Sequence, residues 1–179
     1  MRHPSIAKLD GVAGQGSSTE IDIFLQPGEF FVGDASFRVR TLLGSCVSIT
    51  LWHARHRVGA MSHFLLPYRL GSAKKELEGR YGEDALALML EELNGMGVRA
   101  GACKAKIFGG GDMFPGHTRG GPTIGKKNGE AARSLLARHG IPIISESLFG
   151  NGHRQIIFDI RTGDVWARQD EVSDGRVKT

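Results

Sequence analysis

Residues 41–67 read TLLGSCVSITLWHARHRVGAMSHFLLP, and this stretch decides the fold. Residues 46–52 are rich in β-branched side chains and nearly alternate between apolar and polar, which is typical of a strand. Residues 58–66 are apolar again and end at Pro67, whereas residues 53–57 between the two runs are polar and basic. The pattern therefore predicts two paired strands joined by a solvated connection.

Further strands are predicted on the N-terminal side of this pair. Short apolar segments cover residues 21–31 and 37–43, and Pro27-Gly28 and Gly33-Asp34 interrupt them at predicted turns. Residues 1–19 contain several glycines and serines and show no sustained period. We expect these first residues to form a flexible lead-in to the domain.

Two helices are predicted on the C-terminal side. An amphipathic helix ends at Gly95 or Gly97, and acidic side chains lie off its apolar face. A second helix covers residues 130–139, with Asn128 as its N-terminal cap and Gly140 as its terminator. The apolar residues of the first helix, which recur at helical spacing, are Leu86, Met89, Leu90, Leu93 and Met96.

The remaining segments are β-like, so strand outweighs helix. A strand runs into Gly109-Gly110-Gly111, where the backbone can turn sharply or approach a neighbour closely. Thr162-Gly163 suits the turn between the last two strands. The four predicted strands cover residues 104–108, 142–147, 154–160 and 164–168.

Composition indicates a single globular α/β domain. The chain has 179 residues, of which 40% are hydrophobic and 23% charged. We expect the domain to cover residues 20–169 and a polar tail to cover residues 170–179. The net charge of +4 is spread along the chain, so nucleic acid is not an expected partner. The chain has no apolar run of membrane-spanning length and no secretory signal, so we expect a cytoplasmic protein without membrane insertion.

No cofactor or metal is predicted. The two cysteines, Cys46 and Cys103, are too few for a disulfide framework, and no histidine lies at metal-ligand spacing. Residues 120–127 match the glycine and lysine positions of a phosphate-binding loop, but Lys127 stands where that loop needs serine or threonine. Cys103 begins a predicted strand without a motif around it and is expected to be a core residue.

Cys46 and His63 form the candidate catalytic pair. Cys46 follows a Gly-Ser turn and opens a strand, where free backbone N–H groups of Ser45 and Cys46 can receive a developing oxyanion. His63 lies in the partner strand, so it can stand near the thiol as a base. Thr41 is the candidate that orients the imidazole. From the residues alone, a buried cysteine and a structural histidine remain alternatives.

Five spaced motifs give the chain a resemblance to the CheD family of chemoreceptor glutamine deamidases. The resemblance covers about residues 28–168, and the motifs lie in the order found in that family. The motifs are Thr41-Leu-Leu-Gly-Ser-Cys46, Gly59-Ala-Met-Ser-His63-Phe-Leu-Leu-Pro67, Ala105-Lys-Ile-Phe-Gly-Gly110 with Met113, Ile124-Gly125 with Asn128, and Thr162-Gly163.

The resemblance implies a function, a fold and partners. Family members convert glutamine side chains of methyl-accepting chemotaxis receptors to glutamate with release of ammonia, and also hydrolyse glutamyl methyl esters. Their fold is similar to the catalytic domains of glutamine-deamidating toxins, with layered mixed β-sheets flanked by helices. The implied nucleophile is Cys46, the implied histidine His63 and the implied threonine Thr41. A CheC-type phosphatase is an implied second partner.

Two other classes of function are weighed against the deamidase. The first is a non-catalytic module that binds a receptor or a phosphatase through the same residues. The second is another cysteine enzyme, a protease or a transglutaminase, which would cleave or cross-link its substrate. The reaction products and the reactivity of Cys46 distinguish these classes.

Overall fold

Nine strands and two α-helices build the part of the chain that the structure, a computed structural model, describes: residues 20–71, 76–115 and 121–170. The expected flexible lead-in and all but the first residue of the expected polar tail lie outside those residues. The elements are β1 (Ile21–Phe24), β2 (Phe30–Asp34), β3 (Phe37–Leu43), β4 (Val47–His53), β5 (Val58–Ser62), α1 (Gly82–Gly95), the 3₁₀ helix η1 (Ala100–Ala102), β6 (Lys104–Gly109), α2 (Ile124–Arg138), β7 (Ile143–Leu148), β8 (His153–Asp159) and β9 (Val165–Asp170).

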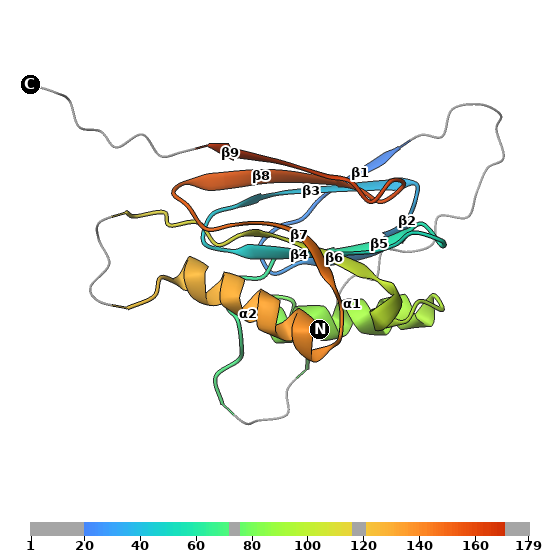
Figure 1. Ribbon diagram of the computed structural model, residues 1–179, viewed down its shortest axis with the longest axis horizontal. Coiled ribbons are helices and arrows are strands. Elements are labelled where there is room, and N and C mark those ends of the chain that lie inside the picture. The colour runs from blue at the N-terminus through green and yellow to red at the C-terminus, as the bar shows by residue number, and fades with distance from the viewer. Residues whose placement is uncertain (1–19, 72–75, 116–120, 171–179) are drawn as a thin grey trace, which may run out of the picture.

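The elements form three layers. A four-stranded sheet has the order β1-β3-β8-β9, and a five-stranded sheet has the order β2-β5-β4-β6-β7. Figure 1 shows the sheets stacked face to face, with α1 and α2 side by side against the other face of the five-stranded sheet. Each sheet contains both parallel and antiparallel pairs. The predicted class, one α/β (α+β) domain of layered mixed sheets flanked by helices, is confirmed.

Strand β4 lies at the centre of the molecule and is buried on both faces. Val47, Ile49 and Leu51 belong to the apolar core that the five-stranded sheet shares with the two helices. The alternate residues, Ser48 and Thr50, are also buried because they face the four-stranded sheet. The predicted pairing with the next segment is confirmed, since β4 and β5 are antiparallel.

A second, smaller core joins the two sheets. Trp52 adds a polar link at its edge, because the indole Nε1–H donates to the carbonyl oxygen of Ile160 at 2.8 Å. Cys46 packs against this second core, whereas Cys103 is buried in the first core, as predicted. The buried residues of this second core are Leu25, Val39, Leu43, Met61, Phe108, Ile156, Phe158 and Ile160.

The N-terminal strands differ from the prediction. Residues 21–31 divide between two sheets, because β1 pairs in parallel with β3 whereas β2 pairs antiparallel with β5. Gly33-Asp34 lies inside β2 and not in a turn; Gly33 pairs with Gly59 across the strands. The turn follows at residues 35–36.

The second helix also differs at its start. It begins at Ile124, and the cap is Thr123, whose hydroxyl oxygen accepts from the Lys126 N–H at 3.2 Å. The prediction that Asn128 caps this helix is therefore wrong: Asn128 lies inside it and is fully buried. Gly140 ends the helix with φ of +65°, as predicted. Lys126, the lysine of the sequence that resembles a phosphate-binding loop at residues 120–127, therefore lies in α2.

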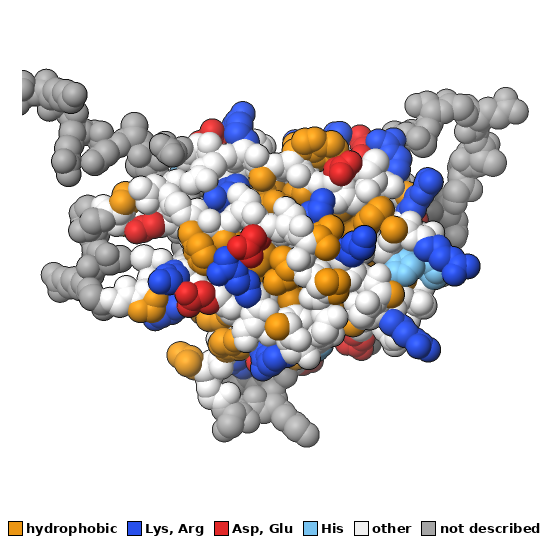
Figure 2. Space-filling view, in the orientation of Figure 1, with side chains coloured by type: hydrophobic (Ala, Val, Ile, Leu, Met, Phe, Trp, Pro, Cys, Tyr) orange, Lys and Arg blue, Asp and Glu red, His pale blue; other side chains and the backbone are white. Residues whose placement is uncertain are grey.

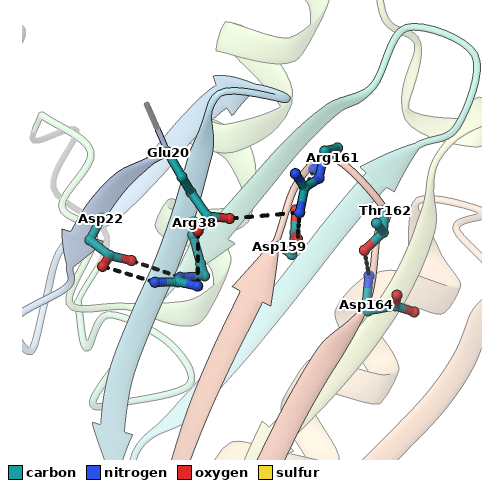
Figure 3. A network of polar contacts seen from close by, with 7 residues as sticks. All are labelled: Glu20, Asp22, Arg38, Asp159, Arg161, Thr162 and Asp164. Carbon is teal, nitrogen blue, oxygen red and sulfur yellow. Dashed lines mark hydrogen bonds and ion pairs between the residues drawn. The ribbon is translucent and has the colours of Figure 1, made fainter. Parts of the chain in front are cut away.

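A polar network holds the short edge strand β1 to its sheet. Arg38 of β3 bonds both carboxylate oxygens of Asp22, at 2.8 and 3.0 Å, and pairs with Glu20 (Figure 3). Arg161 pairs with Asp159 at 3.1 Å and reaches Glu20 at 4.0 Å. Apart from the buried Asp159, these side chains are partly exposed, so the network orients the strand more than it stabilises the fold.

Charges of both signs are distributed over the surface. Figure 2 shows basic and acidic side chains interspersed on one face of the molecule, which agrees with the small net charge of +4. Neither α1 nor α2, the α-helices of the described chain, is long and apolar enough to span a bilayer.

Candidate active site

The site lies where the chain crosses from one sheet to the other. Strand β3 ends at Leu43 in the four-stranded sheet, and β4 begins at Val47 in the five-stranded sheet. Residues 44–46 make the crossing and are half-buried. A β-carbon at Gly44 would lie 2.9 Å from the Met113 sulfur, so the crossing packs closely against the segment that follows β6.

Strand pairing places Cys46 and His63 on one face of the sheet. Val47 and Phe64 exchange two backbone hydrogen bonds, at 3.1 and 3.0 Å, which extend the β4–β5 ladder. In this register His63 lies opposite Ser48, so Cys46 is its diagonal neighbour. Because side chains alternate, both point away from the helices and towards the four-stranded sheet.

Thr41 fixes the orientation and the tautomer of His63. Its Oγ1 lies 2.7 Å from the Leu25 carbonyl oxygen and 2.8 Å from His63 Nδ1. The carbonyl can only accept, so the single hydroxyl proton is donated to it. The ring Nδ1 must then carry a proton and donate to Thr41, which leaves a lone pair on Nε2. All three predicted site residues are therefore brought to one corner of the molecule.

The backbone of His63 is held as firmly as its ring. Its N–H donates to the Glu29 carbonyl oxygen at 2.9 Å, and its carbonyl oxygen accepts from the Gly28 N–H at 2.7 Å. The segment between β1 and β2 therefore wraps around the histidine. This contact requires the unexpected division of residues 21–31 between the two sheets.

Burial sets the charge state of both candidate catalytic groups. It lowers the pKa of His63 to about 4, although the Leu25 carbonyl and the Glu29 charge act in the opposite direction. Burial also raises the pKa of the Cys46 thiol, partly offset by the residue's own N–H. At neutral pH the site thus holds a neutral thiol and a neutral imidazole. Within the described chain, no hydrogen bond joins Sγ to the ring.

The crossing segment presents free N–H groups. Its three carbonyl oxygens are all bonded: Gly44 to the Gly111 N–H at 2.9 Å, Ser45 to the Asn128 amide at 3.0 Å, and Cys46 to the Gly110 N–H at 2.8 Å. The N–H groups of the same three residues donate to no acceptor in residues that the structure describes. Such donors beside a thiol are suited to binding an oxyanion, as the sequence predicts for Ser45 and Cys46.

The glycine run after β6 supports this segment. Gly109 has φ of +110°, and a β-carbon there would overlap the Cys46 carbonyl oxygen. Gly110 has φ of +66°, and its β-carbon would lie 2.6 Å from the Gly125 carbonyl oxygen. The expected close approach of backbone is confirmed, and it is directed at the cysteine.

Two supporting residues were not predicted from the sequence. Asn128 donates to the carbonyl oxygens of Ser45 and Leu65, next to the candidate pair. Arg154 of β8 is buried and donates to the Gly109 carbonyl oxygen at 3.0 Å, so it holds the end of β6 from the opposite sheet. Asn128 is interpreted from the sequence as a helix cap, and its position in one of the five family motifs is the signal that marks it. An arginine in a strand carries no such signal.

Two surface pockets lie outside this corner. One is lined by Thr50, Trp52, Lys106 and neighbours towards the other end of β4. The second is lined by Gly110, Phe149 and the first turn of α2. Neither lining includes Cys46, which is half-buried, or His63, which is 2% exposed. Among the described residues, no group of three His, Cys, Asp or Glu side chains could hold a metal ion.

Comparison with known proteins finds one family that is similar to this chain. The family described as "CheD chemotactic sensory transduction" matches residues 65–169. A protein of Albidiferax ferrireducens named "Probable chemoreceptor glutamine deamidase CheD 2" is 62% identical over 151 residues, which cover 83% of this chain and 87% of the relative.

Two further relatives carry similar names. "Probable chemoreceptor glutamine deamidase CheD 3" of Dechloromonas aromatica is 41% identical over 157 residues, covering 88% of this chain and 92% of the relative. "Probable chemoreceptor glutamine deamidase CheD 1" of Chromobacterium violaceum is 38% identical over 153 residues, covering 85% and 79%. Each alignment omits less than a fifth of the chain, so all three include residues 41–63 whichever end they omit.

Proposed function

The chain belongs to the CheD family, and from that premise we propose that it is a cysteine-dependent chemoreceptor glutamine deamidase. The proposed substrates are glutamine side chains in the cytoplasmic domain of methyl-accepting chemotaxis receptors. The observation that carries the proposed mechanism is the Thr41–His63 hydrogen bond on the face that also bears Cys46. It leaves a basic nitrogen, Nε2, available to the thiol.

The first half-reaction forms a thioester. The Cys46 sulfur attacks the carboxamide carbon while His63 Nε2 takes the thiol proton. The negative charge that develops on the carboxamide oxygen is received by the free N–H groups of the crossing segment. The imidazolium then gives its proton to the departing nitrogen, and ammonia leaves.

The second half-reaction restores the thiol. The neutral imidazole takes a proton from water, and the resulting hydroxide attacks the thioester carbon. The C–S bond breaks, glutamate is released and the sulfur regains a proton from the imidazolium. The balance is one carboxamide and one water converted to one carboxylic acid and one ammonia. A glutamyl methyl ester follows the same steps and releases methanol.

The neutral state of the pair has a mechanistic consequence. A buried imidazole with a pKa of about 4 is available as a base throughout the neutral range. The thiol reaches the imidazole only when the two groups form a hydrogen bond. We propose that binding of the substrate side chain brings Sγ and Nε2 into hydrogen-bond contact, because the bound carboxamide orders the site.

Replacing Cys46 with alanine tests the proposed nucleophile. We expect Cys46→Ala to lower ammonia release from receptor fragments by at least about a thousandfold without loss of the fold, because no other group can form the thioester. Cys103→Ala is the matched control, since that thiol is buried in the helix-side core. Mass spectrometry of the receptor must show the change from carboxamide to carboxyl, without cleavage or cross-links.

Full activity in Cys46→Ala would refute the proposal. The neutral pair, without a hydrogen bond between Sγ and the ring, also suits a second candidate, a non-catalytic module that binds receptors or a phosphatase. Alkylation separates the two. Burial raises the pKa of Cys103 to about 11, so an activated Cys46 is expected to label faster than Cys103. Equally slow labelling of both thiols favours the binding module.

Partners, location and domain limits complete the proposal. A cytoplasmic enzyme would meet the cytoplasmic domain of its receptors without entering the membrane. A CheC-type phosphatase is the proposed second partner, and a pull-down with the purified phosphatase tests it. The domain limits at residues 20 and 169 likewise remain a proposal, which limited proteolysis tests.

A further inference from the structure

One buried side chain connects the two segments that carry the candidate pair. Asn128 lies in α2 with no exposed surface. Its Nδ2 donates to the Ser45 carbonyl oxygen at 3.0 Å and to the Leu65 carbonyl oxygen at 2.8 Å. Both amide protons of Asn128 are therefore used. One bonds the residue before Cys46, and the second bonds Leu65, which lies two positions after His63.

The bond to Ser45 sets the direction of the next N–H group. In a trans peptide the carbonyl and the N–H point in opposite directions, and no cis peptide occurs in the described residues. Because Asn128 draws the Ser45 carbonyl towards α2, the Cys46 N–H points away from α2. It lies beside its own thiol, where it favours the thiolate.

The other two carbonyls of the crossing segment do not depend on a side chain. Gly44 and Cys46 are held by the backbone N–H groups of Gly111 and Gly110. Ser45 alone is held by a side-chain amide. The Asn128 Oδ1 is buried and has no partner among the described residues. An unpaired buried oxygen is unfavourable, so helix stability does not explain an asparagine here.

We propose that Asn128 is a positioning residue of the proposed deamidase: it holds the Ser45–Cys46 peptide so that the Cys46 N–H faces the reacting carbonyl group. The inference rests on the proposed function, because it assigns Asn128 to the oxyanion step of that reaction. Asn128 acts through the backbone and does not touch the substrate.

Asn128→Leu tests the inference, because leucine is neutral, similar in size and has no donor. Asn128→Ala is the second variant in case leucine prevents folding. Thr50→Val is the matched control. It removes another buried side-chain hydrogen bond, from the Thr50 hydroxyl to the Lys106 carbonyl oxygen at 3.2 Å. Thr50 lies in β4, four residues after Cys46. Circular dichroism establishes which variants are folded.

The first measurement is turnover of receptor glutamines. We expect folded Asn128 variants to lower kcat by about a hundredfold and to change KM by less than about threefold, because an oxyanion donor acts mainly in the transition state. Thr50→Val is expected to stay within about threefold of the wild type in both constants.

The second measurement compares two reagents on the Cys46 thiol. Iodoacetamide is attacked at a saturated carbon, and iodide leaves without an oxyanion. p-Nitrophenyl acetate is attacked at a carbonyl carbon, passes through an oxyanion and releases p-nitrophenolate as the thioester forms. In the Asn128 variants we expect acylation to slow by about a hundredfold and alkylation by less than about tenfold, because alkylation loses only the lowering of the thiol pKa by the Cys46 N–H. A merely structural loss would slow both equally.

Two results would overturn the inference. One is a folded Asn128 variant that retains kcat within about threefold of the wild type. The other is an equal loss of acylation and alkylation. If the wild-type protein produces no glutamate, the proposed function fails instead, and the ratio of the two reagent rates still tests the role of Asn128.

Discussion

At the scale of single residues, Thr41 decides which nitrogen of His63 is basic. Its hydroxyl donates to the Leu25 carbonyl and accepts from Nδ1, so the lone pair can only lie on Nε2. A histidine of the other tautomer would present an N–H to the thiol and could not take its proton. The threonine therefore matters for its hydroxyl and for the position of that hydroxyl.

Substitution of Thr41 tests this relation. We expect Thr41→Val to lower kcat by about tenfold to a hundredfold, with KM nearly unchanged, because the imidazole loses the acceptor that holds its tautomer. The measurement is steady-state ammonia release from a receptor fragment.

Thr41→Ser is the control for this prediction. Serine retains the hydroxyl and is expected to keep kcat within about threefold of the wild type. A serine variant as impaired as the valine variant would show that the methyl group, and not the hydroxyl, supports the site.

At the scale of elements, the site is a meeting of strand ends. The end of β3, the start of β4, the end of β5 and the end of β6 converge, and α2 covers the junction through Asn128. The β6 end contributes through Gly109 and Gly110, whose positive φ values let the backbone bond the Cys46 carbonyl. Each element supplies one constraint on the crossing segment.

Gly109→Ala tests the contribution of the β6 end. The substitution would place a methyl group on the Cys46 carbonyl oxygen and strain a residue at φ of +110°, so we expect a loss of stability on the order of 3 kcal/mol and a large fall in kcat. Urea unfolding and the ammonia assay measure the two effects.

Gly95→Ala is the matched control, since a β-carbon there meets nothing within 4 Å. It lies at the end of α1 and is expected to leave the activity unchanged and the stability equal or higher. A Gly109→Ala variant as stable and active as this control would contradict the close approach of Gly109 to the Cys46 carbonyl oxygen.

At the scale of the whole molecule, the three layers keep His63 neutral. His63 is 2% exposed, because it lies between the two sheets under the segment that joins β1 to β2. Its pKa of about 4 lies well below the ordinary value of 6.5. The native protein therefore resists a proton that the unfolded chain accepts.

This difference predicts a loss of stability in acid. The contribution of neutral His63 to the free energy of unfolding is fully present above pH 6.5. It decreases as the pH falls from 6.5 to about 4, and the total loss is about 3 kcal/mol. Chemical unfolding at a series of pH values measures it.

His63→Gln separates this contribution from that of the carboxylates. Glutamine has no titrating group, so the variant is expected to lose less stability than the wild type between pH 6.5 and 4. Equal acid sensitivity in both proteins would show that His63 titrates normally in the native state.

Much of this organisation can be predicted from the sequence because it depends on local patterns. Alternation and β-branching predicted the β4–β5 pair, and helical spacing predicted α1. The positions of Cys46 and His63 in that pair were sufficient to bring them to one face. The glycines after β6 indicated a close approach but not its target.

Only the tertiary structure decided the partners of these local elements. It placed β1 and β2 in different sheets, and it brought Asn128 to the Ser45 carbonyl across 83 residues of chain. In the described residues it also leaves the Cys46 thiol without a hydrogen bond to the His63 imidazole. The physical reason is that periodicity reports which side of an element is buried, whereas a sheet partner or a side-chain bond depends on residues far away in the chain. Local sequence patterns thus predict the candidate catalytic pair, whereas the packing of three layers sets its charge state and its supports.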